Sequence, residues 1–112
     1  MNLTLKQLHD LLLARHNALS DQLGHEADPA KAEAILTEMQ ELLHRIDLVQ
    51  GLLFRQSSQK LDDCLARIKK ADDALGQATQ SIKNAADLVK SMSEFLKAVD
   101  EAIDLAKTLA VT

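Results

Sequence analysis

Glu41 and His44 have a spacing that helical metal centres use. Residues three apart lie on one face of a helix, and di-iron carboxylate bundles take a glutamate and a histidine ligand from this arrangement. The apolar positions of the same segment, such as Leu42 and Ile46, define a different helix face. No histidine follows position 44, so the chain holds no second motif of this kind. We therefore expect a solvated pair, no metal site and no cofactor.

The other residues that could do chemistry are histidines, one cysteine and adjacent acids. His9 and His16 are seven residues apart, about 10 Å along a helix, which is too far for one ion. Cys64 is the only cysteine and falls among apolar residues, which predicts a small buried side chain. The aspartates at 62–63 and 72–73 point about 100° apart on a helix and do not converge. Because the sequence also lacks a phosphate-binding or nucleophile motif, we predict that the protein is not an enzyme.

The charge balance disfavours several classes of partner. Thirteen basic and 17 acidic residues give a net charge of −4, which lacks the positive field that drives nucleic-acid binding. The longest uninterrupted apolar run is four residues, Leu11 to Ala14, so no transmembrane segment is expected. The first residues lack the basic and apolar regions of a signal peptide. Together with the single cysteine, these features predict a cytoplasmic protein.

The composition favours helices over strands. Of 112 residues, 46% are hydrophobic but only 2% are aromatic, and leucine and alanine dominate the apolar set. These side chains lose little conformational freedom in a helix. Three glycines and one proline leave few turns, so the elements must be few and long. The chain is predicted to form a single all-α domain over 1–112.

Two helices are predicted in the first half of the chain. The first covers 3–23, where leucines recur on one face, and it ends at Gly24, a residue type that suits a helix C-terminus. The second covers 29–55. It starts there because Asp28 can cap a helix and Pro29 suits the first helical position.

A seven-residue repeat predicts a coiled-coil-like third helix over 58–110. The repeat pairs a row of large residues with a row of smaller ones three places later, which lets a neighbouring helix approach closely. The large row is Leu61, Ile68, Leu75, Ile82, Val89, Leu96 and Ile103, followed by Ala110. The second row is Cys64, Ala71, Ala78, Ala85, Met92, Val99 and Ala106.

A continuous third helix would extend well beyond its neighbours. It would be roughly 80 Å long, whereas the first two helices would cover about 40 Å of it. The uncovered apolar stripe is a feature that soluble monomers seldom expose. A second copy of the chain is the simplest cover, because two-fold dimers are the commonest oligomers. We therefore predict an antiparallel bundle of three long helices that forms a homodimer within 85–110, through Val89, Met92, Phe95, Leu96, Val99 and Ile103.

The alternative is a break between Gly76 and Gln80 that folds the chain back as a fourth helix. The unbroken heptad phase across Gly76 favours a continuous helix. If the chain breaks instead, the same apolar groups become an internal core. The reason for expecting a homodimer then disappears.

These features predict a non-enzymatic protein–protein interaction module. A small chaperone, adaptor or inhibitor would act through apolar helix faces in this way, with itself and another protein as partners. One alternative is an amphipathic helical protein that binds a lipid surface through the stripe at 85–110. A metal-binding helical bundle is a further alternative, with Glu41 and His44 as its only candidate ligands.

Overall fold

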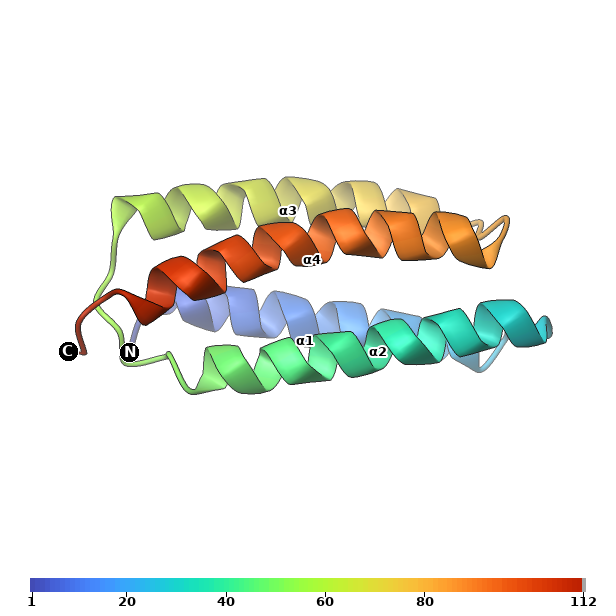
Figure 1. Cartoon of the computed structure of the whole chain (residues 1–112), viewed down its shortest axis with the longest axis horizontal. Helices are drawn as coiled ribbons and strands as arrows, with labels where there is room; N and C mark the ends of the chain where they lie inside the picture. Colours follow the sequence, from blue (N-terminus) through green and yellow to red (C-terminus); the bar gives the residue numbers. More distant parts are fainter. Residues whose placement is uncertain (112) are drawn as a thin grey trace.

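The computed structural model describes residues 1–111, and this part of the chain contains four helices. Consecutive helices run antiparallel (Figure 1). The predicted all-α antiparallel bundle is therefore confirmed, in its four-helix form. The helices are α1 (Leu3–Leu23), α2 (Pro29–Gln50), α3 (Gln59–Thr79) and α4 (Ala85–Lys107).

The helices are arranged as two antiparallel hairpins packed side by side. Helix α1 packs on α2 and α3 packs on α4, while α2 contacts α4 and α1 contacts α3 across the two hairpins. Both chain ends and the α2–α3 connection lie at one end of the bundle, as Figure 1 shows. The α1–α2 and α3–α4 connections lie at the opposite end. The bundle measures 47 × 20 × 16 Å.

Helix α1 covers the residues predicted for it, whereas α2 is shorter than predicted. The Asn2 side chain caps α1 by accepting a hydrogen bond from the Leu5 amide at 3.1 Å. Helix α2 begins at Pro29 but ends at Gln50 instead of 55. The amide of Gly51 bonds back to carbonyls of the last turn, and the chain then leaves the helix. The predicted end was wrong because leucines in this turn extend the helical pattern after the helix has stopped.

The prediction of a continuous helix over 58–110 was also wrong. Helix α3 ends at Thr79, and α4 begins at Ala85 after a five-residue connection. The Thr79 hydroxyl donates to the Gly76 carbonyl, a local bond that competes with helix continuation. Asn84 then caps α4 by accepting from the Asp87 amide at 2.9 Å. A capping side chain of this kind satisfies free amides at a new helix start.

Gly76 lies within α3 and is not the break itself. A Cβ atom at this position would come within 3.2 Å of the Arg15 guanidinium on α1. That guanidinium donates to the Asp72 carboxylate at 2.9 Å and so joins α1 to α3. The glycine therefore makes room for a contact between helices.

The core contains most of the residues predicted to form a dimer contact. All four helices contribute buried apolar side chains, and α4 contributes the largest group. The reversal of the chain lays that group against α2 and α3. Within it are five of the six predicted contact residues: Met92, Phe95, Leu96, Val99 and Ile103.

The sixth residue, Val89, is 45% exposed although it belongs to the large row of the heptad. Ala78, in the smaller row, is exposed as well, and Ile82 lies in the connection between the helices. The repeat therefore fails around the turn, although its positions on α4 from Met92 to Ala106 are buried. Helices α3 and α4 are two separate amphipathic helices. One seven-residue repeat happens to fit the apolar positions of both.

Candidate functional site

Four exposed apolar side chains belong to segments that meet at one end of the bundle. They belong to Met1, Leu3, Phe54 and Val111, which we call the terminal apolar cluster. Each is between 61% and 72% exposed, more than any other large apolar side chain among residues 1–111. The cluster is therefore the most exposed apolar surface of the described chain.

Backbone hydrogen bonds bring together the three segments that form the terminal apolar cluster. The Asn2 amide donates to the Leu53 carbonyl at 2.7 Å, which places the first residues beside the α2–α3 connection. Arg55 forms an isolated antiparallel bridge with Val111. The Arg55 guanidinium also donates to the Leu109 carbonyl at 3.0 Å. The cluster is thus built on fixed backbone although its members are far apart in the sequence.

A second exposed apolar surface lies along the junction of α1 and α2, and we call it the leucine seam. It consists of Leu13, Leu36 and Leu43, which are 41–47% exposed. Leu36 and Leu43 are seven residues apart and so share a helix face. Both lie about 180–200° around α2 from Arg45, which faces α4, and are therefore directed away from α4.

The α2–α4 groove is the main polar hollow on the side of the bundle. It has a volume of about 470 Å³ and is lined by nine residues. Val89, the exposed member of the predicted contact set, belongs to it. The lining residues are Thr37, Glu38, Glu41, Arg45, Val89, Ser93, Leu96, Lys97 and Asp100.

Arg45 ties the two walls of the groove together. Its Nε and Nη2 atoms donate to the two carboxylate oxygens of Asp100 at 2.8 and 3.0 Å. Its Nη1 atom donates to the carboxylate of Glu41 at 2.9 Å and to the Glu41 carbonyl at 3.1 Å. Burial disfavours the guanidinium charge, but the bonds to Asp100 and Glu41 outweigh it and raise the pKa of Arg45. Paired bonds of this kind hold the Arg45 side chain in one position, so it forms a fixed part of the groove lining.

Glu38 is the most buried acid of the groove, although its carboxylate oxygens still reach solvent. The residue is only 7% exposed. None of the hydrogen bonds or ion pairs in the described chain involves its side chain. Burial raises the pKa of Glu38, the charge of Glu41 raises it further, and Arg45 opposes both. The partial burial of Glu38 therefore favours its neutral form relative to a fully exposed glutamate.

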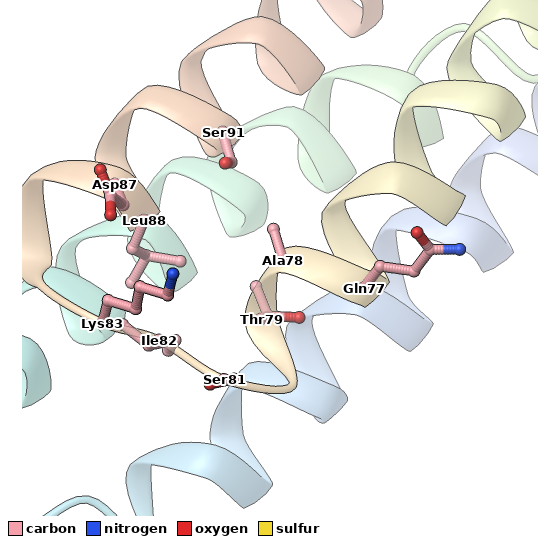
Figure 2. Close-up of a pocket in the computed structure, with 9 residues that line it drawn as sticks. All are labelled: Gln77, Ala78, Thr79, Ser81, Ile82, Lys83, Asp87, Leu88 and Ser91. Carbon is pink, nitrogen blue, oxygen red and sulfur yellow. The ribbon is translucent and has the colours of Figure 1, made fainter.

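Another hollow, of about 370 Å³, lies where α3 turns into α4 (Figure 2). Figure 2 shows Ile82 and Lys83 of the connection between the end of α3 and the start of α4. The polar groups beside this hollow already form hydrogen bonds at the end of α3 and the start of α4. Asn84 and Asp87 bond to each other, and the Gln22 side chain donates to the Thr79 carbonyl. We therefore regard this hollow as a consequence of the turn.

The structure places the residues that the sequence singled out for chemistry apart from one another. Glu41 borders the groove and bonds to Arg45, while His44 is exposed. Within residues 1–111, no three or more His, Cys, Asp or Glu side chains lie close enough to hold a metal ion. His9 and His16 are half-buried. Cys64 is buried, and its sulfur accepts a hydrogen bond from Arg67 at 3.2 Å.

Sequence analysis did not anticipate the surfaces that the fold assembles. Glu38 follows the apolar pattern of α2 in position, which was a signal that the residue would be largely buried. The terminal apolar cluster left no such signal, because its members belong to three separate segments.

Comparison with protein-family models, with curated proteins and with solved structures finds no significant match. Among the described residues, no helix is both long enough and apolar enough to cross a membrane.

Proposed function

We propose that the protein is a non-enzymatic interaction module that binds another protein through the terminal apolar cluster. The observation that carries this proposal is the grouping of four highly exposed apolar side chains on fixed backbone at one end of the bundle. A chaperone, adaptor or inhibitor of another protein is the class of activity that such a surface serves.

Burial of this cluster by a partner would provide a substantial driving force. Full burial of a large apolar side chain is worth about 1.5–3 kcal/mol. Phe54 adds an aromatic group, the type that most often dominates binding energy at the centre of an interface. Exposed polar residues nearby, such as Gln56 and Thr108, resemble the polar rim of such an interface.

The proposed partner is a different protein and not a second copy of this chain. The expected homodimer depended on an uncovered stripe along a continuous third helix. That helix folds back, and five of the six residues in the expected contact are buried within the chain's own core. The uncovered stripe that led us to expect a homodimer is therefore not present in the described chain.

Site-specific photo-crosslinking in the native host tests the proposal. A benzoylphenylalanine at position 54 is expected to give one discrete protein adduct on irradiation, because Phe54 would lie at the centre of the contact. The matched control carries the same group at Lys70, an exposed position on the outer face of α3. The adduct is expected to disappear when Leu3 is replaced by serine in the position-54 protein.

Two outcomes would contradict the proposal. One is the same set of adducts from positions 54 and 70, which would show only random encounters. The other is an adduct with lipid and none with protein, which would favour the alternative of a lipid-surface protein.

A further inference from the structure

We propose that the leucine seam binds a basic amphipathic helix of a partner protein. The seam lies on the outer face of the first hairpin, the face of α1 and α2 that is directed away from the second hairpin. This inference goes beyond the proposed function, because the seam and the terminal apolar cluster are different surfaces. Each is therefore testable without the other.

The leucine seam presents apolar groups of both helices to one side of the hairpin. Leu13 lies about 200° around α1 from Arg15, which binds Asp72 on α3. Leu13 is therefore directed away from α3, as Leu36 and Leu43 are directed away from α4. Because α1 and α2 run antiparallel from their common connection, Leu13 lies at a level between Leu36 and Leu43 (Figure 1). Apolar groups along the junction of two helices can accept the ridge of a third helix.

The net charge of the chain is concentrated on the hairpin that carries the seam. Residues 1–50, which include α1 and α2, have a net charge of −4, whereas residues 51–112 have a net charge of zero. Two of the four basic side chains in the first hairpin, Arg15 and Arg45, bind acids of the second hairpin. These two guanidinium groups therefore face inward and do not balance the acids of the outer face.

Exposed acids flank the leucines of the seam on α2. Glu33 precedes Leu36 by three residues and Asp47 follows Leu43 by four, so these four side chains share one face of the helix. Lys31 lies about 160° around the helix from this face. Among residues 1–111, no ion pair involves Glu33 or Asp47. The α2 side of the seam is thus apolar at its centre and anionic at both ends.

A basic amphipathic helix complements the seam in both spacing and charge. Leu36 and Leu43 are about 10.5 Å apart along α2, which is also the distance between residues i and i+7 of a partner helix. Glu33 and Asp47 are about 21 Å apart, so basic residues about 14 positions apart on that helix would reach both. A second copy of the chain would instead bring like charges together, and an anionic lipid surface would be repelled in the same way.

Amide chemical shifts of the ¹⁵N-labelled protein locate the binding of a synthetic helix. The probe is a peptide of about 18 residues with leucines at i, i+3, i+7 and i+10 and lysines beside this row. Saturable shifts are expected within residues 9–20 and 33–47, with a dissociation constant on the order of 10–100 μM. One control peptide has its leucines scrambled over all faces, and another has glutamate in place of every lysine. Both are expected to bind at least about tenfold more weakly.

Leu43→Gln and Val89→Gln test the apolar part of the seam as a matched pair. Both native side chains are 45% exposed, but only Leu43 belongs to the seam. Leu43→Gln is expected to raise the dissociation constant of the lysine peptide about fivefold or more, whereas Val89→Gln should leave it unchanged. Both variants are expected to keep a native urea midpoint, because neither side chain is in the buried core.

Asp47→Lys and Asp104→Lys test the charge of the seam. Each aspartate is exposed and lies three residues before the end of its helix, and the two substitutions change the net charge equally. Only Asp47→Lys is expected to weaken binding, by about threefold or more. Added salt is also expected to weaken binding to the native chain, because it screens exposed charges.

Equal effects of the two members of either pair would overturn this inference, as would equal binding of a control peptide or shifts confined to the terminal apolar cluster. Shifts of the seam residues that grow with protein concentration alone would assign the seam to a second copy instead. The same shifts on addition of anionic phospholipid vesicles would assign it to a membrane surface. The crosslink at position 54 involves none of these residues, so it decides the proposed function separately.

Discussion

Replacement of Phe95 by alanine is expected to lower the free energy of unfolding by about 3–5 kcal/mol. Phe95 is 1% exposed and is among the largest fully buried side chains of the described chain. It lies on α4 and borders a small hollow with Ala71 and Leu75 of α3. Removal of the ring would leave a cavity between the two helices of the second hairpin. Urea unfolding followed by circular dichroism measures the change.

Phe54→Ala is the matched control, since the sequence contains only these two phenylalanines. Phe54 is 61% exposed, so its truncation is expected to change the free energy of unfolding by less than about 1 kcal/mol. Similar urea midpoints for the two variants would contradict the assignment of Phe95 to the core. The pair also separates folding from binding, because Phe54→Ala should remain folded and lose the proposed partner.

Asn2→Ala is expected to cost about 2–3 kcal/mol, an unusually large effect for a residue so near a chain end. Asn2 is 4% exposed. Its side-chain oxygen caps α1, and its side-chain nitrogen donates to the carbonyls of Arg55 and Gln56 at 3.2 and 3.0 Å. Alanine removes the cap and leaves both carbonyls without this donor. The urea midpoint, measured as for Phe95, gives the loss.

Asn84→Ala is the corresponding control at the start of α4. Asn84 is exposed, and its oxygen also caps a helix, but within residues 1–111 its side chain makes no bond to another segment. The expected loss is about 1 kcal/mol, the ordinary value of a helix cap. If the two variants lost equal stability, Asn2 would be acting as a cap only and not as a link between α1 and the α2–α3 connection.

Local signals in the sequence were sufficient to locate α1 and the start of α2. Asn2, Gly24 and Pro29 act through neighbouring backbone, so their roles are visible in a few consecutive residues. The apolar periodicity likewise identified the buried leucines of α1, but it also included Leu43 and Val89, which are both 45% exposed. The all-α bundle follows from these features alone.

The turn between α3 and α4 was harder to predict because no strong helix breaker marks it. Residues 80–84 contain neither glycine nor proline. The chain reverses there because Asn84 caps a new helix and because reversal buries Met92 and Phe95 against the rest of the bundle. That gain comes from tertiary packing, which an apolar heptad pattern does not distinguish from a continuous helix.

The candidate surfaces depend even more on tertiary structure. Glu38 and Asp100 are brought to one groove only when α2 and α4 pack together. Leu3, Phe54 and Val111 lie at one end of the bundle only because backbone bonds join the terminal segments to the α2–α3 connection. Neither arrangement can be predicted from the spacing of residues along the sequence.

A distance between spin labels at positions 66 and 108 tests the reversal at residues 80–84 most directly. Both positions are exposed, so the labels do not disturb the core. The four-helix bundle predicts a separation of about 20 Å between the two backbones, because α3 and α4 run antiparallel and side by side. A continuous helix would place them about 63 Å apart, and that result would contradict both the buried core of α4 and the groove that it forms with α2.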